Sequence, residues 1–135
     1  MNQKVQVWVC HHKEVLLLKL IPSRGGAWHP ITANVDDDEK LLDCAKRETR
    51  EETGLKAKEG KWIDLEFSFE YHGRWGHAKE SVFAFILDEK AHDIEIDSSE
   101  HTAFKWVSID EAEEELHHGP QKEALEKLKC ILSKT

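Results

Sequence analysis

Short stretches in which apolar and polar residues alternate recur along the 135-residue chain, and this is the pattern of half-buried strands. The first two stretches lie on either side of a polar segment, residues 11–13, and predict a β-hairpin. A loop rich in Pro and Gly is expected at 22–26. The remaining spacing predicts a strand and turn at 28–35, a turn at 72–77, and strands at 5–10, 14–21, 61–71, 81–87 and 103–107.

Helical spacing occurs once in the first half of the chain and twice near its end. The clearest helix spans residues 36–53, where three Asp residues at the start suit the helix dipole and Gly54 supplies a stop. Ser108 and Glu111 have the spacing of a capping box at the start of a second helix, and a Gly-Pro pair separates it from a last helix at 121–132. Mixed strands with one early and two late helices predict the α+β class, in a single domain of 135 residues.

Composition excludes several classes of protein. Apolar residues make up 39% of the chain, which is enough for a globular core. The formal net charge of −8 gives no general attraction to nucleic-acid phosphates or anionic membranes, so neither is an expected partner. If the substrate itself carries several phosphates, a bound divalent cation has to reverse the sign of the local field.

Three cysteines, far apart and without a CxxC pair, argue against a disulfide framework and against a zinc site. They fit a reducing compartment. The N-terminus shows no signal-peptide pattern, and the longest apolar run, residues 15–18, is too short to span a bilayer. We therefore expect a cytoplasmic protein, either a monomer or a homodimer.

On a helical wheel, residues 36–55 carry an inward stripe that begins apolar and ends in carboxylates. Burying unpaired carboxylates is unfavourable, and the single guanidinium of Arg47 cannot balance three of them. A hard divalent cation suits such a cluster, and Mg²⁺ also keeps water ligands. The alternative is that the glutamates form the solvated end of a surface helix. The stripe comprises Leu41, Cys44, Ala45, Glu48, Glu51, Glu52 and Leu55, with Glu39, Asp43, Lys46 and Arg50 opposite.

Residues 33–55 resemble the signature box of the Nudix family. That box is a Gly, five residues, Glu, seven residues, then Arg-Glu, an apolar residue, any residue, Glu-Glu, any residue, Gly and an apolar residue. Here Glu39 is followed by seven residues and then by RETREETGL, from Arg47 to Leu55. The resemblance implies an α/β/α sandwich around a mixed sheet, with a loop-helix-loop segment that binds divalent cations and the diphosphate of the substrate, and with C-terminal helices.

The resemblance also implies roles for single residues. Arg47 corresponds to a structural residue that orients a box carboxylate, Glu39 to the residue that fixes the loop to the helix, and Gly54 to the Gly near the end of the box. The corresponding metal ligands are Glu48, Glu51 and Glu52.

Two residues depart from the box. Ala33 stands where the family has Gly; it keeps the backbone carbonyl that can bind metal, but a positive φ there would cost Ala roughly 1 kcal/mol. Thr49 replaces the usual aliphatic residue.

Segments 28–33, 79–83 and 100–106 are similar to relatives of the dihydroneopterin triphosphate pyrophosphatase. By that likeness Glu80 is a fourth metal ligand or the general base; the alternative is an edge residue in solvent. Trp28 is a candidate for stacking on a base or pterin ring, although an early Trp more often belongs to a core. Lys19, Arg24 and Arg74 are candidate phosphate contacts, although a cation at such a position more often belongs to the solvated surface.

These features predict Mg²⁺-dependent attack of water on a phosphorus atom, with Mn²⁺ as an alternative metal. One carboxylate, from Glu51, Glu52 or Glu80, takes the proton from the water. The resemblance favours a nucleoside triphosphate-like substrate, such as dihydroneopterin triphosphate or a nucleotide, with a monophosphate and pyrophosphate as products. A hydrolase of nucleotide sugars or dinucleoside polyphosphates is the alternative reaction, and a silent nucleotide-binding module is the alternative class.

Overall fold

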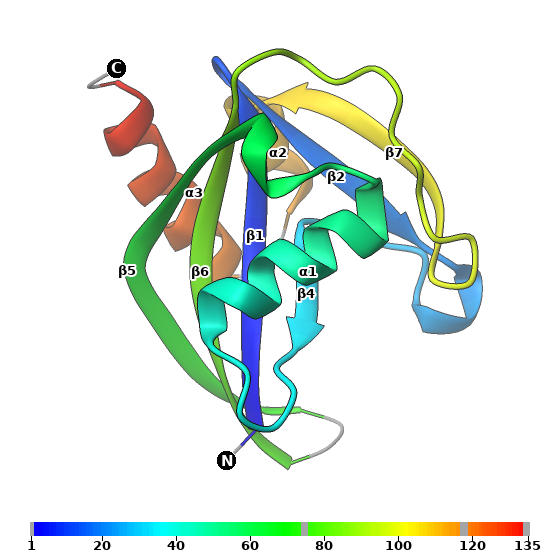
Figure 1. The fold of residues 1–135 in the computed structure, drawn as a ribbon, viewed down its shortest axis with the longest axis vertical. Coiled ribbons are helices and arrows are strands. Elements are labelled where there is room, and N and C mark those ends of the chain that lie inside the picture. Colours follow the sequence, from blue (N-terminus) through cyan, green and yellow to red (C-terminus); the bar gives the residue numbers. More distant parts are fainter. Residues whose placement is uncertain (1, 74–75, 117–118, 134–135) are drawn as a thin grey trace.

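A mixed β-sheet lies at the centre of the molecule, with one helix in front of it and the C-terminal helix behind it in the view of Figure 1. The computed structural model describes residues 2–73, 76–116 and 119–133. The predicted α+β class is confirmed. The strands are β1 (Asn2–His11), β2 (Glu14–Leu20), β3 (Trp28–His29), β4 (Ile31–Asn34), β5 (Gly60–Gly73), β6 (Gly76–Leu87) and β7 (His101–Ser108), and the helices are α1 (Leu41–Thr53), α2 (Ile109–Glu115) and α3 (Gly119–Leu132), with short 3-10 helices η1 (Pro22–Arg24) and η2 (Ala57–Glu59).

The strand order is β3-β2-β1-β6-β5, with β4 added to β1 and β7 to β2. β1 and β6 run parallel, and the other pairs are antiparallel. Across the middle of the sheet, Lys4 of β1 lies between Asn34 of β4 and Glu80 of β6. Because α1 follows β4 in the chain, this register brings the start of the box segment near the start of β6.

Alternation along β1 divides its side chains between two cores. One core lies between the sheet and α1, and the other lies between the sheet and the pair α2 and α3. The parity of a strand residue therefore decides which helix its side chain can meet. The α1 core includes Val5, Val7, Val9, Phe83, Phe85, Cys44 and Ala45, and the second core includes Trp8, Cys10, Val82, Ala84, Leu125 and Leu128.

Helix α1 begins later than predicted. Residues 36–40 form a turn, with Asp38 at a φ of 65° and Lys40 in the N-cap position. The carboxylate of Glu39 accepts a hydrogen bond from the backbone N–H of Asp36 (3.1 Å), which closes this turn before the helix starts. Glu39 therefore does not lie on the helical wheel at all. The predicted stop is confirmed, because Gly54 takes the left-handed cap conformation at a φ of 79°.

The predicted strand at 28–35 is two short strands, β3 and β4, on either side of Pro30, which has no N–H to give to a ladder. The loop predicted at 22–26 contains η1, and the hairpin turn after β1 is confirmed. Strands β5 and β6 shorten the turn predicted at 72–77, of which residues 74–75 lie outside the described part of the chain. No helix in the described ranges is both long and apolar enough to cross a membrane.

Thr49, the departure from the aliphatic box position, lies on the buried side of α1. It is fully buried, and its hydroxyl oxygen has no hydrogen-bond partner among the described residues. We expect Thr49→Val to raise the free energy of unfolding by about 1 kcal/mol, because valine has nearly the same shape and removes a buried polar group that lacks a partner. Urea denaturation measures the change, and a loss of stability would show that the hydroxyl is bonded in solution.

Candidate active site

Arg47 is the centre of an ionic cluster that joins the turn before α1 to the helix. Its Nε and Nη2 donate to the two oxygens of Glu39 at 2.8 and 3.0 Å, and its Nη1 donates to Glu48 (2.8 Å) and Glu51 (3.2 Å). The guanidinium holds the pKa of Glu39 down to about 2. The contacts have the form that the resemblance implied for Arg47 and Glu39, since one cation fixes the turn and orients the carboxylates of the helix.

Glu52, Glu100 and His101 form a second cluster, at the C-terminal end of α1. Side-chain ligand atoms of the three residues lie within 4.8 Å of one another, and Glu52 and His101 are only 5% and 4% exposed. Burial raises the pKa of Glu52 to about 7, and the neighbouring Glu100 adds to the rise while His101 opposes it. Glu100 and Glu52 therefore favour sharing one proton when no cation is present.

Two buried polar atoms of this cluster lack a hydrogen-bond partner among the described residues. They are Nδ1 of His101 and Oε2 of Glu52, which lie 2.9 Å apart, within ion-pair distance. A cation ligated by the carboxylates would satisfy the oxygen. The donor set of two carboxylates fits Mg²⁺, and the nearby imidazole is a donor that Mn²⁺ also accepts.

The helical wheel is right for two of the three box glutamates. Glu52 is buried, and the side chain of Glu48 is 17% exposed. Glu51 lies at the edge of the stripe with its side chain 55% exposed, so its predicted inward placement is wrong. Thr49 and Thr53 fill the inward positions beside Glu52 instead. The metal role of each glutamate stays a prediction.

Ala33 does not need the conformational freedom of the Gly that it replaces. It lies in β4 opposite Val5, is 8% exposed, and is not among the described residues with positive φ. The left-handed residue of this segment is Asp38. The turn thus adapts after the strand and not at Ala33, whose carbonyl role stays a prediction.

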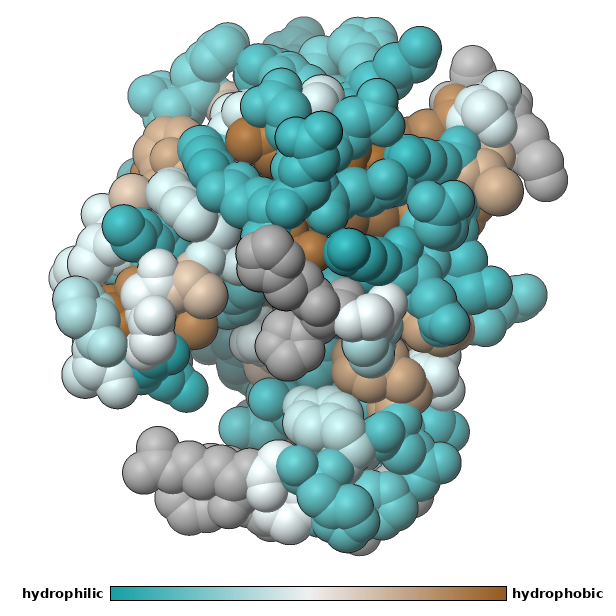
Figure 2. Space-filling model, turned by 180° about the vertical axis from the view of Figure 1, so that it is seen from behind, coloured by the Kyte–Doolittle hydropathy of each residue, from teal (hydrophilic) through white to brown (hydrophobic). Residues whose placement is uncertain are grey.

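A cavity of about 530 Å³ lies beside β3, between the start of α3 and the far end of β5. It lies on the side of the molecule that faces the viewer in Figure 2, where the surface is hollowed beside the η1–β3 segment. Its size is within the range of small-molecule sites. Its lining includes Lys4, Gln6, Trp28, His29, Tyr71 and Glu80.

Glu80 lies in this cavity and not in solvent. It is 5% exposed, and it accepts hydrogen bonds from Gln6 Nε2 (2.6 Å) and Tyr71 OH (3.0 Å). By strand parity it shares a face with Val82 and Ala84, which pack toward α3. The reading of Glu80 as a solvated edge residue is wrong, and the sheet separates its side chain from α1. The structure therefore does not bring Glu80 together with the box glutamates.

The predicted substrate contacts divide between the cavity and the cluster of Glu52, Glu100 and His101. Trp28 lines the cavity, and Nζ of Lys105 lies 4.2 Å from the centre of its ring, while Nζ of Lys19 lies 5.9 Å away. Arg24 points instead to the cluster of Glu52, Glu100 and His101, where it contacts Glu100 at 3.2 Å. The prediction for Arg74 falls outside the described residues.

His29 links the cavity to the cluster of Glu52, Glu100 and His101. It lines the cavity, and its Nε2 lies 2.9 Å from Nε2 of His101, with the two rings stacked at 22°. Burial, with a contribution from His101, lowers the pKa of His29 to about 3. One ring must therefore donate and the other accept in this contact, and His29 stays neutral in the fold.

The stability of the fold should depend on pH through His29, whose ring is neutral in the folded state. An unfolded histidine takes up a proton near pH 6.5, whereas folded His29 does so only near pH 3. The contribution of His29 to the stability of the folded state is complete above pH 6.5 and is lost as the pH falls toward 3. As the pH falls from 6 to 4, we expect the free energy of unfolding of His29→Phe to rise relative to that of the wild type. The difference should grow by at most about 1.4 kcal/mol per pH unit. Urea denaturation in EDTA measures this, and a difference that is constant with pH would contradict it.

Sequence reasoning gave no role to several residues that the structure places at these sites. Glu100 and His101 stand in segment 100–106, whose likeness to the pyrophosphatase relatives was the available signal. Lys4 and Tyr71 carried no local signal, because only sheet pairing brings them beside Glu80.

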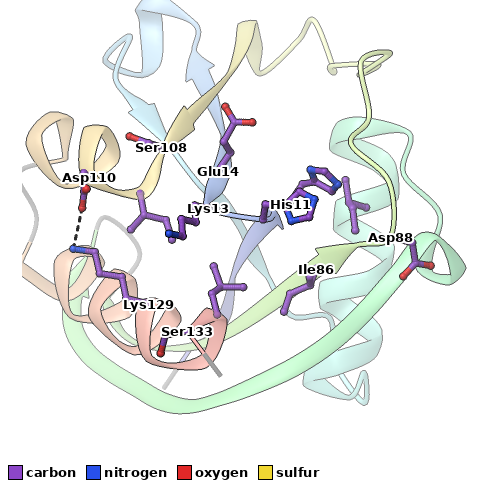
Figure 3. Close-up of a pocket in the computed structure, with 13 residues that line it drawn as sticks. His11, Lys13, Glu14, Ile86, Asp88, Ser108, Asp110, Lys129 and Ser133 are labelled. Atoms are coloured by element: carbon purple, nitrogen blue, oxygen red, sulfur yellow. Dashed lines mark ion pairs between the residues drawn. The ribbon is translucent and has the colours of Figure 1, made fainter. Parts of the chain in front are cut away.

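A second, larger cavity of about 880 Å³ lies at the other end of β1 (Figure 3). Residues of the first hairpin, among them His11, Lys13 and Glu14, line it together with Lys129 of α3, which pairs with Asp110. None of the predicted site residues in the described part of the chain lines it. We therefore place the candidate active site at the smaller cavity.

Comparison with known proteins identifies the fold and the family. A family model described as the NUDIX domain matches residues 2–128. The asymmetrical bis(5'-nucleosyl)-tetraphosphatase of Rattus norvegicus is 38% identical over 87 residues. This match covers 63% of the chain and 58% of the rat protein, so the chain spans little more than half the length of that curated relative.

Two solved structures share the fold. The E. coli dihydroneopterin triphosphate pyrophosphohydrolase has a TM-score of 0.81 at 22% identity, over 93% of this chain and 92% of that one. The C. elegans Ap4A hydrolase, a binary complex, has a TM-score of 0.81 at 20% identity, over the full length of both chains. The predicted Nudix fold is confirmed, and the family match over nearly the whole sequence shows that this chain belongs to the NUDIX domain family.

Proposed function

We propose that the protein is a metal-dependent hydrolase of phosphoanhydride bonds in nucleotide-like substrates. The observation that carries this proposal is the buried cluster of Glu52, Glu100 and His101, joined through His29 to a cavity with an aromatic wall. A substrate made of a flat ring and a polyphosphate uses both features, because the ring needs an apolar face and the phosphates need a cation.

In this proposal Glu48, Glu52 and Glu100 would hold the cation, and a bound cation there would supply neutralisation of the diphosphate oxygens and polarisation of the scissile bond. Arg47 keeps the box carboxylates in place through the contacts described above. Glu51 is exposed beside them and takes the proton from the attacking water. Positioning and neutralisation of charge supply most of the acceleration in phosphoryl chemistry.

The cavity favours a substrate with one ring. Its volume of about 530 Å³ suits one nucleoside-sized group, as does the presence of one tryptophan among the described residues that line it, and Lys4 on its wall can meet a phosphate. We therefore favour a nucleoside triphosphate-like substrate that yields a monophosphate and pyrophosphate. Dinucleoside tetraphosphates are the second candidate, because the relatives from rat, mouse and pig, 33–38% identical, are named asymmetrical bis(5'-nucleosyl)-tetraphosphatases.

A substrate panel tests the proposal. The protein is incubated with nucleoside triphosphates, dihydroneopterin triphosphate, a nucleotide sugar and diadenosine tetraphosphate, with Mg²⁺, with Mn²⁺ or with EDTA, and the products are separated. We expect metal-dependent release of pyrophosphate from at least one triphosphate. Release of a nucleoside triphosphate and a monophosphate from the dinucleotide alone would favour the second candidate. Lack of turnover on the whole panel would contradict hydrolysis and favour a silent binding module.

A further inference from the structure

We propose that Glu80 selects a ring whose edge presents two adjacent N–H donors, as the 2-amino-4-oxo edge of guanine or of a pterin does. This inference rests on the proposed function, because it assigns the ring of the substrate to the cavity. It gives Glu80 a different role from the metal ligand or general base that the family resemblance implies.

The position of Glu80 in the cavity is the first support. Its side chain is almost fully buried, yet it is part of the wall that Trp28 also lines. Trp28 is covered by the Lys105 ammonium 4.2 Å from its ring centre, and it offers an aromatic surface to the same cavity. A ring stacked on tryptophan meets the rest of the cavity wall with its edge, and hydrogen-bonding groups on that wall then discriminate between edges.

The second support is the way in which the carboxylate is held. Gln6 donates to one oxygen and Tyr71 to the other, and the indole N–H of Trp8 donates to the amide oxygen of Gln6 at 2.7 Å. The last contact fixes which end of the Gln6 amide faces Glu80. A carboxylate has about four acceptor positions, so it can accept from a ligand in addition to its protein donors. Because the carboxylate is held from both sides, it is organised before a ligand arrives.

Ring chemistry gives the direction of the preference. Guanine presents a ring N–H and an amino group side by side, and a 2-amino-4-oxo pterin presents the same pair, which two carboxylate oxygens can accept together. Adenine presents an amino group beside a ring nitrogen that is an acceptor, and an acceptor facing a carboxylate is repelled. A bidentate contact of this kind discriminates by roughly 10- to 100-fold.

A purely structural role for Glu80 makes a different prediction. If the carboxylate only satisfied Gln6 and Tyr71, its removal would lower stability and affect all substrates by the same factor. The ratio of kcat/KM values between two rings is therefore the informative quantity, since a general loss of folding cancels in it.

The experiment compares the full chain with Glu80→Gln, which keeps the shape of the side chain but replaces one acceptor with a donor. For each protein, kcat/KM is measured on GTP, ATP, inosine triphosphate and dihydroneopterin triphosphate with Mg²⁺. Inosine triphosphate lacks the amino group and so offers one of the two donors. Binding of GMP and AMP, followed by tryptophan fluorescence, gives a readout that needs no turnover. Glu89→Gln, which removes the same charge from an exposed position, is the matched control.

For the wild type we expect kcat/KM on GTP or on the pterin triphosphate to exceed kcat/KM on ATP by at least about 10-fold, with the value for inosine triphosphate between them. Whichever of the two leads identifies the natural ring. Glu80→Gln should reduce this ratio by about 10-fold or more, and Glu89→Gln should leave it unchanged. If Glu80→Gln does not fold by urea denaturation, Glu80→Asp, which withdraws the carboxylate, should give a smaller reduction.

Two results would overturn the inference: equal kcat/KM values and equal binding for the guanine and adenine compounds, or an unchanged ratio in a folded Glu80 variant. Failure of the proposed function looks different. In that case no substrate is hydrolysed, while the preference for GMP over AMP is still measurable by fluorescence.

Discussion

Replacing Glu52 with Gln should abolish most of the activity without weakening the fold. We expect kcat/KM to fall roughly 10³-fold, because the charge stabilisation that a held cation gives to phosphoryl chemistry is worth several kcal/mol. Glutamine keeps the shape of the buried side chain but removes a carboxylate whose pKa is raised to about 7 by burial. Above that pH the wild type bears the cost of a buried charge, so the variant should be as stable as the wild type or more so in EDTA.

Steady-state kinetics on the best substrate of the panel and urea denaturation at pH 8 measure the two quantities. Glu89→Gln removes one exposed carboxylate elsewhere on the surface and should change neither. A Glu52→Gln enzyme with wild-type turnover would remove Glu52 from the metal site. A parallel loss of activity and stability would instead assign it a structural role.

Replacing Arg47 with Ala should reduce activity by about 10- to 100-fold, the usual effect of losing a residue that orients metal ligands. The variant leaves Glu39, Glu48 and Glu51 without the guanidinium that they share. It should also lose about 1–3 kcal/mol of stability; the side chain is 32% exposed, so solvent screening keeps the loss at the lower end.

Arg50→Ala is the matched control, because Arg50 is exposed on the same helix and makes no ion pair with a described residue. Its effect on stability should stay within about 0.5 kcal/mol. Kinetics and thermal unfolding of both variants test the expectation. Equal behaviour of Arg47→Ala and Arg50→Ala would show that the Arg47 cluster does not organise the site.

The parts of the site that the sequence predicted well are those set by local spacing. Glu39 and Arg47 meet because one turn and two helical turns separate them, and Gly54 ends the helix because it is the residue that adopts a left-handed cap without strain. The wheel located Glu52 correctly for the same reason. It failed for Glu51, because three charged residues so close together in the sequence cannot all face inward when Thr49 and Thr53 occupy that side.

The parts that the sequence did not predict depend on pairing between distant segments. Helix α1 starts at Leu41 because the side chain of Glu39 closes the preceding turn. The prediction places the three Asp residues before Glu39 in the first turn of the helix, where acidic residues are favoured. Glu80 lies on the face of the sheet opposite α1 because parallel pairing with β1 sets its parity. The meeting of Glu52 with His101 joins residues 49 positions apart and follows only from the complete fold.

The most direct test of the central claim is to locate the cation. A crystal of the wild-type protein is soaked in Mn²⁺, and anomalous scattering shows where the ion binds. We predict a peak bounded by Glu48, Glu52 and Glu100, with no peak at that position in Glu52→Gln. A Mn²⁺ ion bound at Glu80, or the absence of any ion from the Glu52 cluster at saturating Mn²⁺, would contradict the account.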